Sequence, residues 1–183
     1  SGTPAADVNH FVCDLDGTVT DPCSSPLDIN SLGDGSHTFK VTAVDAVGNA
    51  DPTPATFTWT VDTAAPDTTI TAHTVPSGAG GTSINAGDTT AQNSIRFVFS
   101  GTPAADVNHF VCDLDGTITD PCSSPLDITA LGDGSHTFKV TAVDAVGNAD
   151  PTPATFTWTV DTAAPTTSII SAFVPDNSGS QIN

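Results

Sequence analysis

The chain has 183 residues and a formal net charge of −18 at pH 7, and all 21 of its acidic residues are aspartate. Two lysines and one arginine are its only basic residues besides histidine, which excludes the basic surface that binds nucleic acid or an anionic membrane. No apolar run approaches the roughly 20 residues of a membrane-spanning helix, so membrane insertion is not expected. Glu and Met are absent and Lys and Arg are rare, whereas Thr and Val abound. This composition predicts an all-β protein.

An internal repeat organises the chain. Residues 1–66 align with residues 100–165 without a gap and differ from them at three positions. The period of 99 residues is too long for a solenoid unit and has the size of one β-sandwich domain, about 100 residues. We therefore divide the chain into the later part of one repeat at residues 1–66 (the first copy), which lacks two strands, a complete repeat at residues 67–165, and the start of a third at residues 166–183.

The complete repeat consists of short segments in which apolar and polar residues alternate, separated by turn signals. This alternation is typical of half-buried strands and predicts a two-sheet sandwich of seven strands with Greek-key connections. The loops between them are expected at Gly78–Asp88 and Thr102–Asn108. The predicted strands, in chain order, are Thr68–His73, Ser94–Ser100, His109–Leu114, a return strand through Cys122, Leu126–Ile128, Ser135–Asp144 and Thr155–Asp161.

Each copy contains two cysteines at the same spacing. An even number of cysteines at a repeated spacing favours one disulfide per repeat and an oxidising compartment, outside the cell or at its surface. A zinc site is a poor alternative because neither copy contains a closely spaced cysteine pair. We therefore predict the disulfides Cys13–Cys23 and Cys112–Cys122.

The sequence LGDGSHTFKVTAVDAVGN followed by TFTWTVDTAAP resembles the end of a bacterial immunoglobulin-like repeat of the kind found in giant surface adhesins. The resemblance covers Ser94–Pro165 and, through the repeat, Ser1–Pro66. It implies tandem seven-strand immunoglobulin-like sandwiches with calcium at the domain junctions. In such domains an aromatic residue, often Tyr, docks the corner after the Asp-Gly turn. His37 and His136 take that place here, and we expect them to hydrogen-bond the backbone rather than to act in catalysis.

The stretch FVCDLDGTVTD at Phe11–Asp21 is similar to the first motif of the haloacid dehalogenase phosphatases, in which two aspartates act as nucleophile and general acid. That chemistry needs a parallel α/β sheet, and no segment of this chain has the helical pattern that its crossovers require. The motif also occurs twice in one period of 99 residues, and its Asp16-Gly17 pair is a hairpin-turn signal. We therefore predict that the protein is not an enzyme.

Aspartates gather in the linker after each closing strand and in the loops that this linker should meet. Calcium takes six to eight oxygen ligands from Asp, Asn and backbone carbonyls, so such loops can hold it. In a seven-strand sandwich the last strand ends opposite the loop between the final two strands, so the linker reaches that loop of the next copy. The alternative is that these aspartates only form solvated turns. The predicted ligands at the junction are Asp62 and Asp67 of the linker with Asp106, Asp144, Asn148 and Asp150, and the corresponding residues of neighbouring junctions are Asp45, Asn49, Asp51 and Asp161.

These features predict a structural segment, a stalk or filament, of a long extracellular or cell-surface protein that is stiffened by calcium between its domains. Its expected partners are neighbouring copies of the repeat, which could also build a homopolymeric filament, and a host or glycan ligand at an unseen tip. The alternative is a glycan- or receptor-binding module that uses loops such as Thr102–Asn108. Near-identical copies favour the spacer, as does the inward placement of Trp59 and Trp158.

Overall fold

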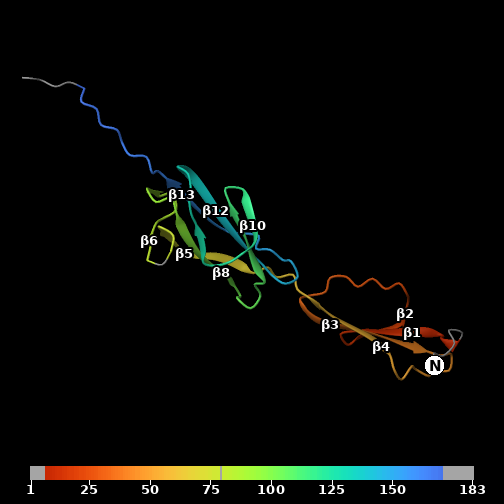
Figure 1. Cartoon of the computed structure of the whole chain (residues 1–183). Helices are drawn as coiled ribbons and strands as arrows, with labels where there is room; N and C mark the ends of the chain where they lie inside the picture. Colours follow the sequence, from red (N-terminus) through yellow and green to blue (C-terminus); the bar gives the residue numbers. More distant parts are fainter. Residues whose placement is uncertain (1–6, 79, 171–183) are drawn as a thin grey trace, which may run out of the picture. The chain divides into compact units, whose positions relative to one another are not determined.

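The computed structural model describes residues 7–78 and 80–170, which form strands and loops with no α-helix (Figure 1). None of these residues belongs to a helix that is long and apolar enough to cross a membrane. The described residues divide into two compact units. Within the described ranges, one unit draws on residues 7–67, Thr102–Asn108 and Ala142–Pro151, and the other on residues 68–78, 80–101, His109–Thr141 and residues 152–170. Two loops of the complete repeat therefore belong to the same unit as the first copy.

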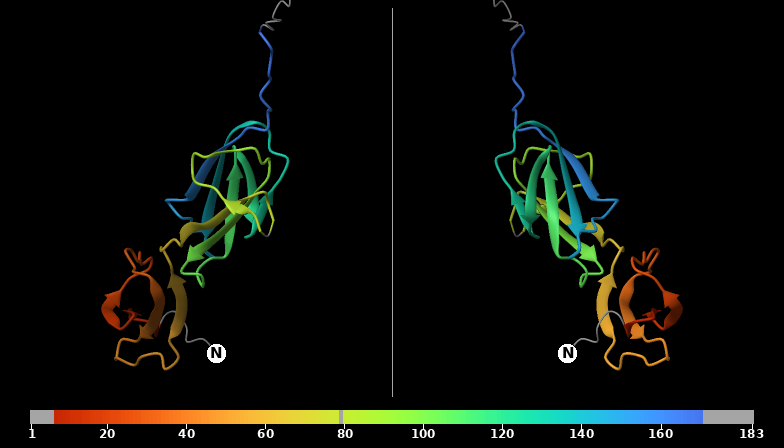
Figure 2. Two further views of the ribbon diagram at one scale, coloured as in Figure 1. Left: turned by 90° about the vertical axis from the view of Figure 1, so that its left-hand side faces the viewer. Right: turned by 90° about the vertical axis from the view of Figure 1, so that its right-hand side faces the viewer.

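The first copy forms a single antiparallel sheet with the strand order β2-β1-β3-β4. A two-residue turn, Asp16-Gly17, joins its first two strands, with φ angles of 51° and 87°. Two-residue hairpin loops need positive φ at both central residues, which is why Asp-Gly suits this position. Figure 2 shows these red and orange strands as one layer. The strands are β1 (His10–Leu15), β2 (Thr18–Cys23), β3 (Gly35–Val44) and β4 (Ala55–Val61).

The complete repeat forms two sheets, with the strand orders β10-β9-β12-β13-β7 and β11-β8-β5-β6. It is therefore a β-sandwich, as the sequence predicted. Its longer strands lie within one or two residues of their predicted bounds. They are β5 (Asp67–Val75), β6 (Thr82–Ser83), β7 (Thr89–Thr90), β8 (Ile95–Thr102), β9 (His109–Leu114), β10 (Thr117–Cys122), β11 (Leu126–Ile128), β12 (Gly134–Val143) and β13 (Ala154–Val160).

Two short strands were not predicted, so the expected number of seven strands per repeat was too small. The predicted loop Gly78–Asp88 contains β6, which pairs with the end of β5. Just after this loop, β7 runs parallel to the end of β13, where Thr89 pairs with Thr159. Two-residue strands are too short to show a period-two pattern, so only the pairing partners reveal them.

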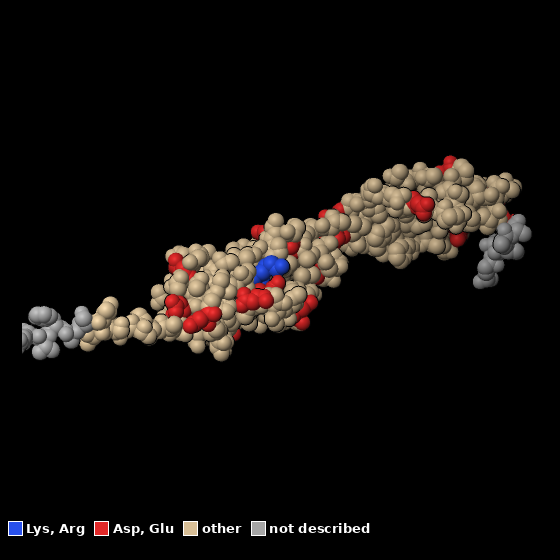
Figure 3. Space-filling view, turned by 90° about the horizontal axis from the view of Figure 1, so that it is seen from above, with Lys and Arg blue, Asp and Glu red and all other residues tan. Residues whose placement is uncertain are grey.

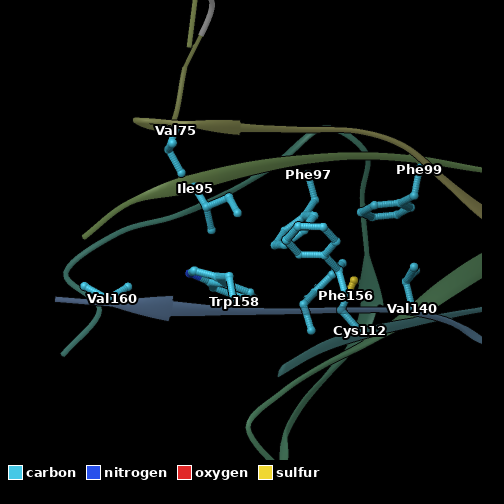
Figure 4. Packing of buried hydrophobic residues seen from close by; sticks show 10 residues of the cluster. Val75, Ile95, Phe97, Phe99, Cys112, Val140, Phe156, Trp158 and Val160 are labelled. Carbon is cyan, nitrogen blue, oxygen red and sulfur yellow. The ribbon is translucent and has the colours of Figure 1, made fainter. Parts of the chain in front are cut away.

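The core of the complete repeat lies between its two sheets. Figure 4 shows Ile95, Phe97 and Phe99 of β8 extending from one layer toward Phe156 and Trp158 of β13 in the other. The side chains of Phe97 and Trp158 are 0% and 1% exposed. Their ring centroids lie 5.5 Å apart in an edge-to-face arrangement, which adds to the stabilisation from burial alone. The period-two pattern of the sequence thus identified the inward-facing residues correctly.

Both predicted disulfides are formed. Cys13 is bonded to Cys23 and Cys112 to Cys122, each pair separated by 10 residues. In the complete repeat the bond links β9 to β10, which are neighbours in the sheet β10-β9-β12-β13-β7. Cys112 is buried at 3% exposure, so the disulfide belongs to the core as well as to the sheet.

Reduction of the disulfides is expected to destabilise the complete repeat by about 3 kcal/mol, because it frees a closed loop of about eleven residues in the unfolded chain. Urea unfolding of oxidised and reduced protein, followed by the fluorescence of Trp158 in a Trp59→Phe background, measures the difference. Free thiols in native material by mass spectrometry, or equal unfolding free energies, would contradict the prediction.

Candidate metal centre

Three aspartates far apart in the sequence meet in one compact unit. Asp62 follows β4, Asp106 lies between β8 and β9, and Asp144 follows β12. Carboxylate oxygens of the three lie within 4.8 Å of one another. Asp144 is only 2% exposed, and the other two side chains are half-buried. This group, the carboxylate cluster, contains three of the residues that the sequence predicted at the junction.

Asp144 is held in place by the turn that follows it. Its Oδ1 accepts hydrogen bonds from the backbone N–H groups of Val146, Gly147 and Asn148 at 2.9, 2.7 and 2.8 Å. Burial alone would raise the pKa of Asp144, but the bonds from Asn148 and from the backbone outweigh it and hold this pKa below its ordinary value of 3.8. Asp144 is therefore an ionised carboxylate at neutral pH.

Asn148 connects this turn to the linker. Its Nδ2 donates to Oδ2 of Asp144 at 2.7 Å and to the backbone carbonyl of Asp62 at 3.0 Å. The linker residue and the turn are thus joined by a protein contact even without an ion. Oδ2 of Asp144 thus accepts the side-chain bond from Asn148, and Oδ1 accepts the three backbone bonds of the turn.

In the part of the chain that the structure describes, each lysine and arginine pairs with an aspartate outside the carboxylate cluster. The chain has one arginine and two lysines. Arg96 pairs with Asp127 at 2.6 Å, Lys40 lies 3.7 Å from Asp14, and Lys139 lies 3.8 Å from Asp113. On the face in Figure 3, red acidic side chains are spread widely and blue is confined to one place. Like charges this close repel one another, so the cluster provides a strongly negative position for a cation.

The other predicted ligands have different surroundings. Asp67 is exposed and is not a member of the carboxylate cluster. Asp150 is 4% exposed, and its N–H donates to the carbonyl of Ala142 at 3.0 Å. Asp161, the counterpart of Asp62 one period later, is exposed and accepts a bond from Ala163 N–H at 3.1 Å. The structure therefore brings together Asp62, Asp106, Asp144 and Asn148, but not Asp67.

The first copy repeats the same loops. Asp45 accepts hydrogen bonds from the backbone N–H and side-chain Nδ2 of Asn49, both at 2.8 Å. Oδ1 of Asp51 accepts bonds from the N–H and hydroxyl of Thr53 at 2.8 and 3.0 Å. With Asp7, the counterpart of Asp106, these loops line an open hollow of about 190 Å³. The hollow corresponds to the position of the carboxylate cluster.

The donor set of the carboxylate cluster fits a hard cation. Three carboxylates supply up to six oxygens, and calcium binds six to eight oxygen ligands in flexible geometries, with water completing the shell. Magnesium demands a nearly ideal octahedron and gives up its water reluctantly. Thiolate and imidazole, which zinc prefers, are absent from the cluster. The residues present therefore fit calcium better than zinc or magnesium.

The corner histidines make a second polar arrangement, and the sequence predicted only part of it. Nε2 of His136 donates to the carbonyl of Gly132 at 2.9 Å, which is the expected backbone bond. Its Nδ1 donates to Oδ2 of Asp115 at 2.7 Å, and Oδ1 of Asp115 accepts from Thr137 N–H, also at 2.7 Å. His37 and Asp16 repeat this pattern in the first copy. The second aspartate of the DLDG stretch thus forms the hairpin turn and also binds the corner histidine.

Both ring nitrogens of His136 donate to oxygens that can only accept, so the ring binds best as the charged imidazolium. Burial would lower the pKa of His136, but the bonds to Asp115 and Gly132 raise it above the ordinary value of 6.5. Burial likewise opposes the shift at Asp115, whose pKa the bond from His136 holds below 3.8. Each group therefore stabilises the charged form of the other.

The stability of the complete repeat is expected to fall as the pH rises from about 6.5 through the raised folded-state pKa of His136. A histidine with a raised pKa in the folded state contributes fully below its unfolded pKa, and the contribution is lost as the pH passes the folded pKa. Urea unfolding across this range, with Trp158 as the probe, should show the fall in wild type and a flatter profile in His136→Gln. His109→Gln removes a histidine from the same repeat as a control. Equal profiles for wild type and His136→Gln would contradict the prediction.

The sequence matches no protein-family profile and no curated protein. Among solved structures, the chain is similar to fibronectin(III)-like modules of Clostridium thermocellum CbhA, with 17% identity and a TM-score of 0.45 over 87% of this chain and 82% of that one. It is also similar to the extracellular domain of a hybrid two-component system from B. thetaiotaomicron, with 15% identity and a TM-score of 0.43 over 66% of this chain and 18% of that one.

A further similarity is to SGBP-B of the Bacteroides ovatus mixed-linkage glucan utilization locus, solved in complex with a mixed-linkage heptasaccharide. It has 19% identity and a TM-score of 0.26 over 88% of this chain and 39% of that one. The chain thus spans well under half the length of the Bacteroides proteins named here. These structures are similar to the chain at the level of the all-β fold.

Proposed function

We propose that the chain is a structural repeat segment, a stalk or filament, of a long extracellular protein, and that calcium bound by Asp62, Asp106 and Asp144 stiffens the junction between its repeats. The observation that carries this proposal is the carboxylate cluster, whose oxygens lie within 4.8 Å of one another. One member comes from the linker and two come from loops of the following repeat. An ion bound there ties the linker to both loops and limits its motion.

Two further observations support a structural role outside the cell. Consecutive copies are nearly identical, as expected for spacers whose shape matters more than a varied binding surface. Each copy has a disulfide, which suits an oxidising compartment. The partners in this proposal are neighbouring copies of the repeat, in one chain or in a homopolymeric filament. Asp106 is in the loop Thr102–Asn108, so its position in the cluster favours metal binding over a glycan contact for this loop.

Small-angle X-ray scattering of the whole chain, in calcium and in chelator, tests the proposal. The maximum dimension of the particle, and the width of its distribution of interatomic distances, are expected to change with chelation. The reason is that the linker becomes free to hinge when the ion is removed. Asp62→Asn should behave in calcium as wild type does in chelator. Asp161→Asn, which alters the equivalent residue one period later, is the matched control and should respond like wild type. Scattering curves that are the same with and without calcium would refute the stiffening role.

A further inference from the structure

Among the described residues, nothing covers one apolar face of the first copy. Phe57 is 66% exposed and Phe11 is 41% exposed. An apolar hollow of about 420 Å³ lies beside Phe57, lined also by Ile29, Phe39 and Trp59. These five residues, with Leu27, define what we call the open face of the sheet β2-β1-β3-β4. An uncovered sheet face of this kind is typical of an interaction surface.

The complete repeat shows what covers the same residues. Phe156, the counterpart of Phe57, is only 5% exposed, and Phe138, the counterpart of Phe39, is fully buried. Phe97 of β8 stacks on Phe138 with a centroid distance of 4.2 Å and meets Phe156 edge-on at 5.6 Å. In Figure 4 the β8 side chains fill the space above β13. Because the two copies are nearly identical in sequence, the open face presents the same side chains as the covered face and should fit the same kind of covering strands.

The segment Leu-Asp-Ile gives a second indication. At Leu126–Ile128 it forms β11, which pairs with β8 through the partners Leu126–Phe97 and Ile128–Ile95. At residues 27–29 the same three residues form no strand. The tripeptide therefore forms a strand where β8 is its neighbour. In the first copy, residues 27–29 could pair in the same way with a strand like β8.

Charge gives a third indication. Arg96 of β8 donates from Nε and Nη2 to the two carboxylate oxygens of Asp127 at 2.8 and 2.6 Å. Such a two-bond ion pair adds geometric specificity to a strand pairing. Asp28 is the counterpart of Asp127, and the chain has no second arginine to pair with it. An occupant of the open face would thus carry a cation opposite Asp28.

We propose that the open face is a docking surface for a pair of strands with the pattern of β5 and β8, supplied by a further repeat of the same kind. The described residues contain two faces of this type, one in the first copy and one in the complete repeat. They contain one strand pair of this pattern, β5 and β8, which covers the face of the complete repeat. Exchange of strands between two molecules of this chain would leave the same number of faces uncovered, so a strand pair from outside residues 7–170 is needed. This inference is independent of the calcium site.

The test adds a fluorescent peptide of residues 67–101 to the whole chain and measures binding by anisotropy. Saturable binding of one peptide per chain is expected. The Phe97→Asp peptide should bind at least tenfold more weakly, and Phe57→Asp in the chain should cause a similar loss. The Arg96→Ala peptide should bind several-fold more weakly to wild type, and this difference should shrink on Asp28→Asn. Because Phe57 is exposed in the first copy, its substitution leaves the complete repeat folded.

Other outcomes would overturn the proposal. Absence of saturable binding, or binding that Phe57→Asp does not weaken, would show that the open face does not take the strand pair. Dimerisation of the chain alone in sedimentation experiments, abolished by Phe57→Asp, would identify a second copy as the occupant instead. If the peptide is insoluble, the same segment can be fused to the chain instead. Residues 67–99 placed directly before Ser1 should shift the emission of Trp59 to shorter wavelength, and unchanged emission would contradict the proposal.

Discussion

Replacement of Phe156 by alanine is expected to destabilise the complete repeat by about 3–5 kcal/mol. The side chain is 5% exposed and its ring contacts Phe97 at a centroid distance of 5.6 Å. Removing it costs the free energy of transfer of a phenyl ring and leaves a cavity between the two sheets. A loss of this size is a large part of the stability of a domain of about 100 residues.

The first copy supplies a matched control for this experiment. Phe57 has the same sequence neighbours as Phe156 but is 66% exposed, so Phe57→Ala is expected to change stability by less than about 0.5 kcal/mol. Urea unfolding followed by Trp158 fluorescence in a Trp59→Phe background measures both variants with the same probe. Equal effects of the two substitutions would contradict the location of Phe156 in a core between the two sheets.

Calcium is expected to stabilise the complete repeat by about 2.7 kcal/mol at a hundredfold excess over its dissociation constant. The effect follows from mass action, because an ion that binds Asp106 and Asp144 in the folded chain has no such site in the unfolded one. Thermal unfolding in calcium and in chelator, recorded by calorimetry, measures the difference.

The variant Asp62→Asn makes this prediction more specific because the sign of its effect should depend on calcium. In chelator it removes one of three mutually repelling carboxylates, so it should be at least as stable as wild type. In calcium it removes a ligand, so it should be less stable than wild type. Asp161→Asn should follow wild type in both conditions. An Asp62→Asn protein that gains as much from calcium as wild type would contradict the assignment.

The sequence predicted well those parts of the fold that depend on long periodic segments. The inward face of β8, with Ile95, Phe97 and Phe99, follows directly from the alternation along Ser94–Ser100. The pairs Cys13–Cys23 and Cys112–Cys122 follow from the repeated spacing. These predictions hold because burial on one face of a strand imposes its pattern on every second residue.

Other parts depend on partners that are distant in the sequence. Residues 27–29 and Leu126–Ile128 are identical tripeptides, and only the neighbour β8 makes the second a strand. The bond between Asp115 and His136 spans 21 residues, and the Asp-Gly turn signal gave no indication of it. Asp67 was predicted at the junction with Asp62, but it begins β5 and its side chain is exposed. The composition of the loops predicted which residues could bind calcium. Which of these residues come close together depends on the path of the backbone, which the sequence pattern did not reveal.

The most direct test of the calcium site is an isothermal titration of the metal-free chain with calcium. We expect a bound ion that is lost in Asp62→Asn and in Asp106→Asn and retained in Asp161→Asn. Asp62 and Asp161 have the same neighbours in the sequence, but only Asp62 lies in the carboxylate cluster, so the comparison separates the site from the general acidity of the chain. Absence of binding at millimolar calcium, or equal binding by Asp62→Asn and Asp161→Asn, would contradict the calcium-stiffened junction.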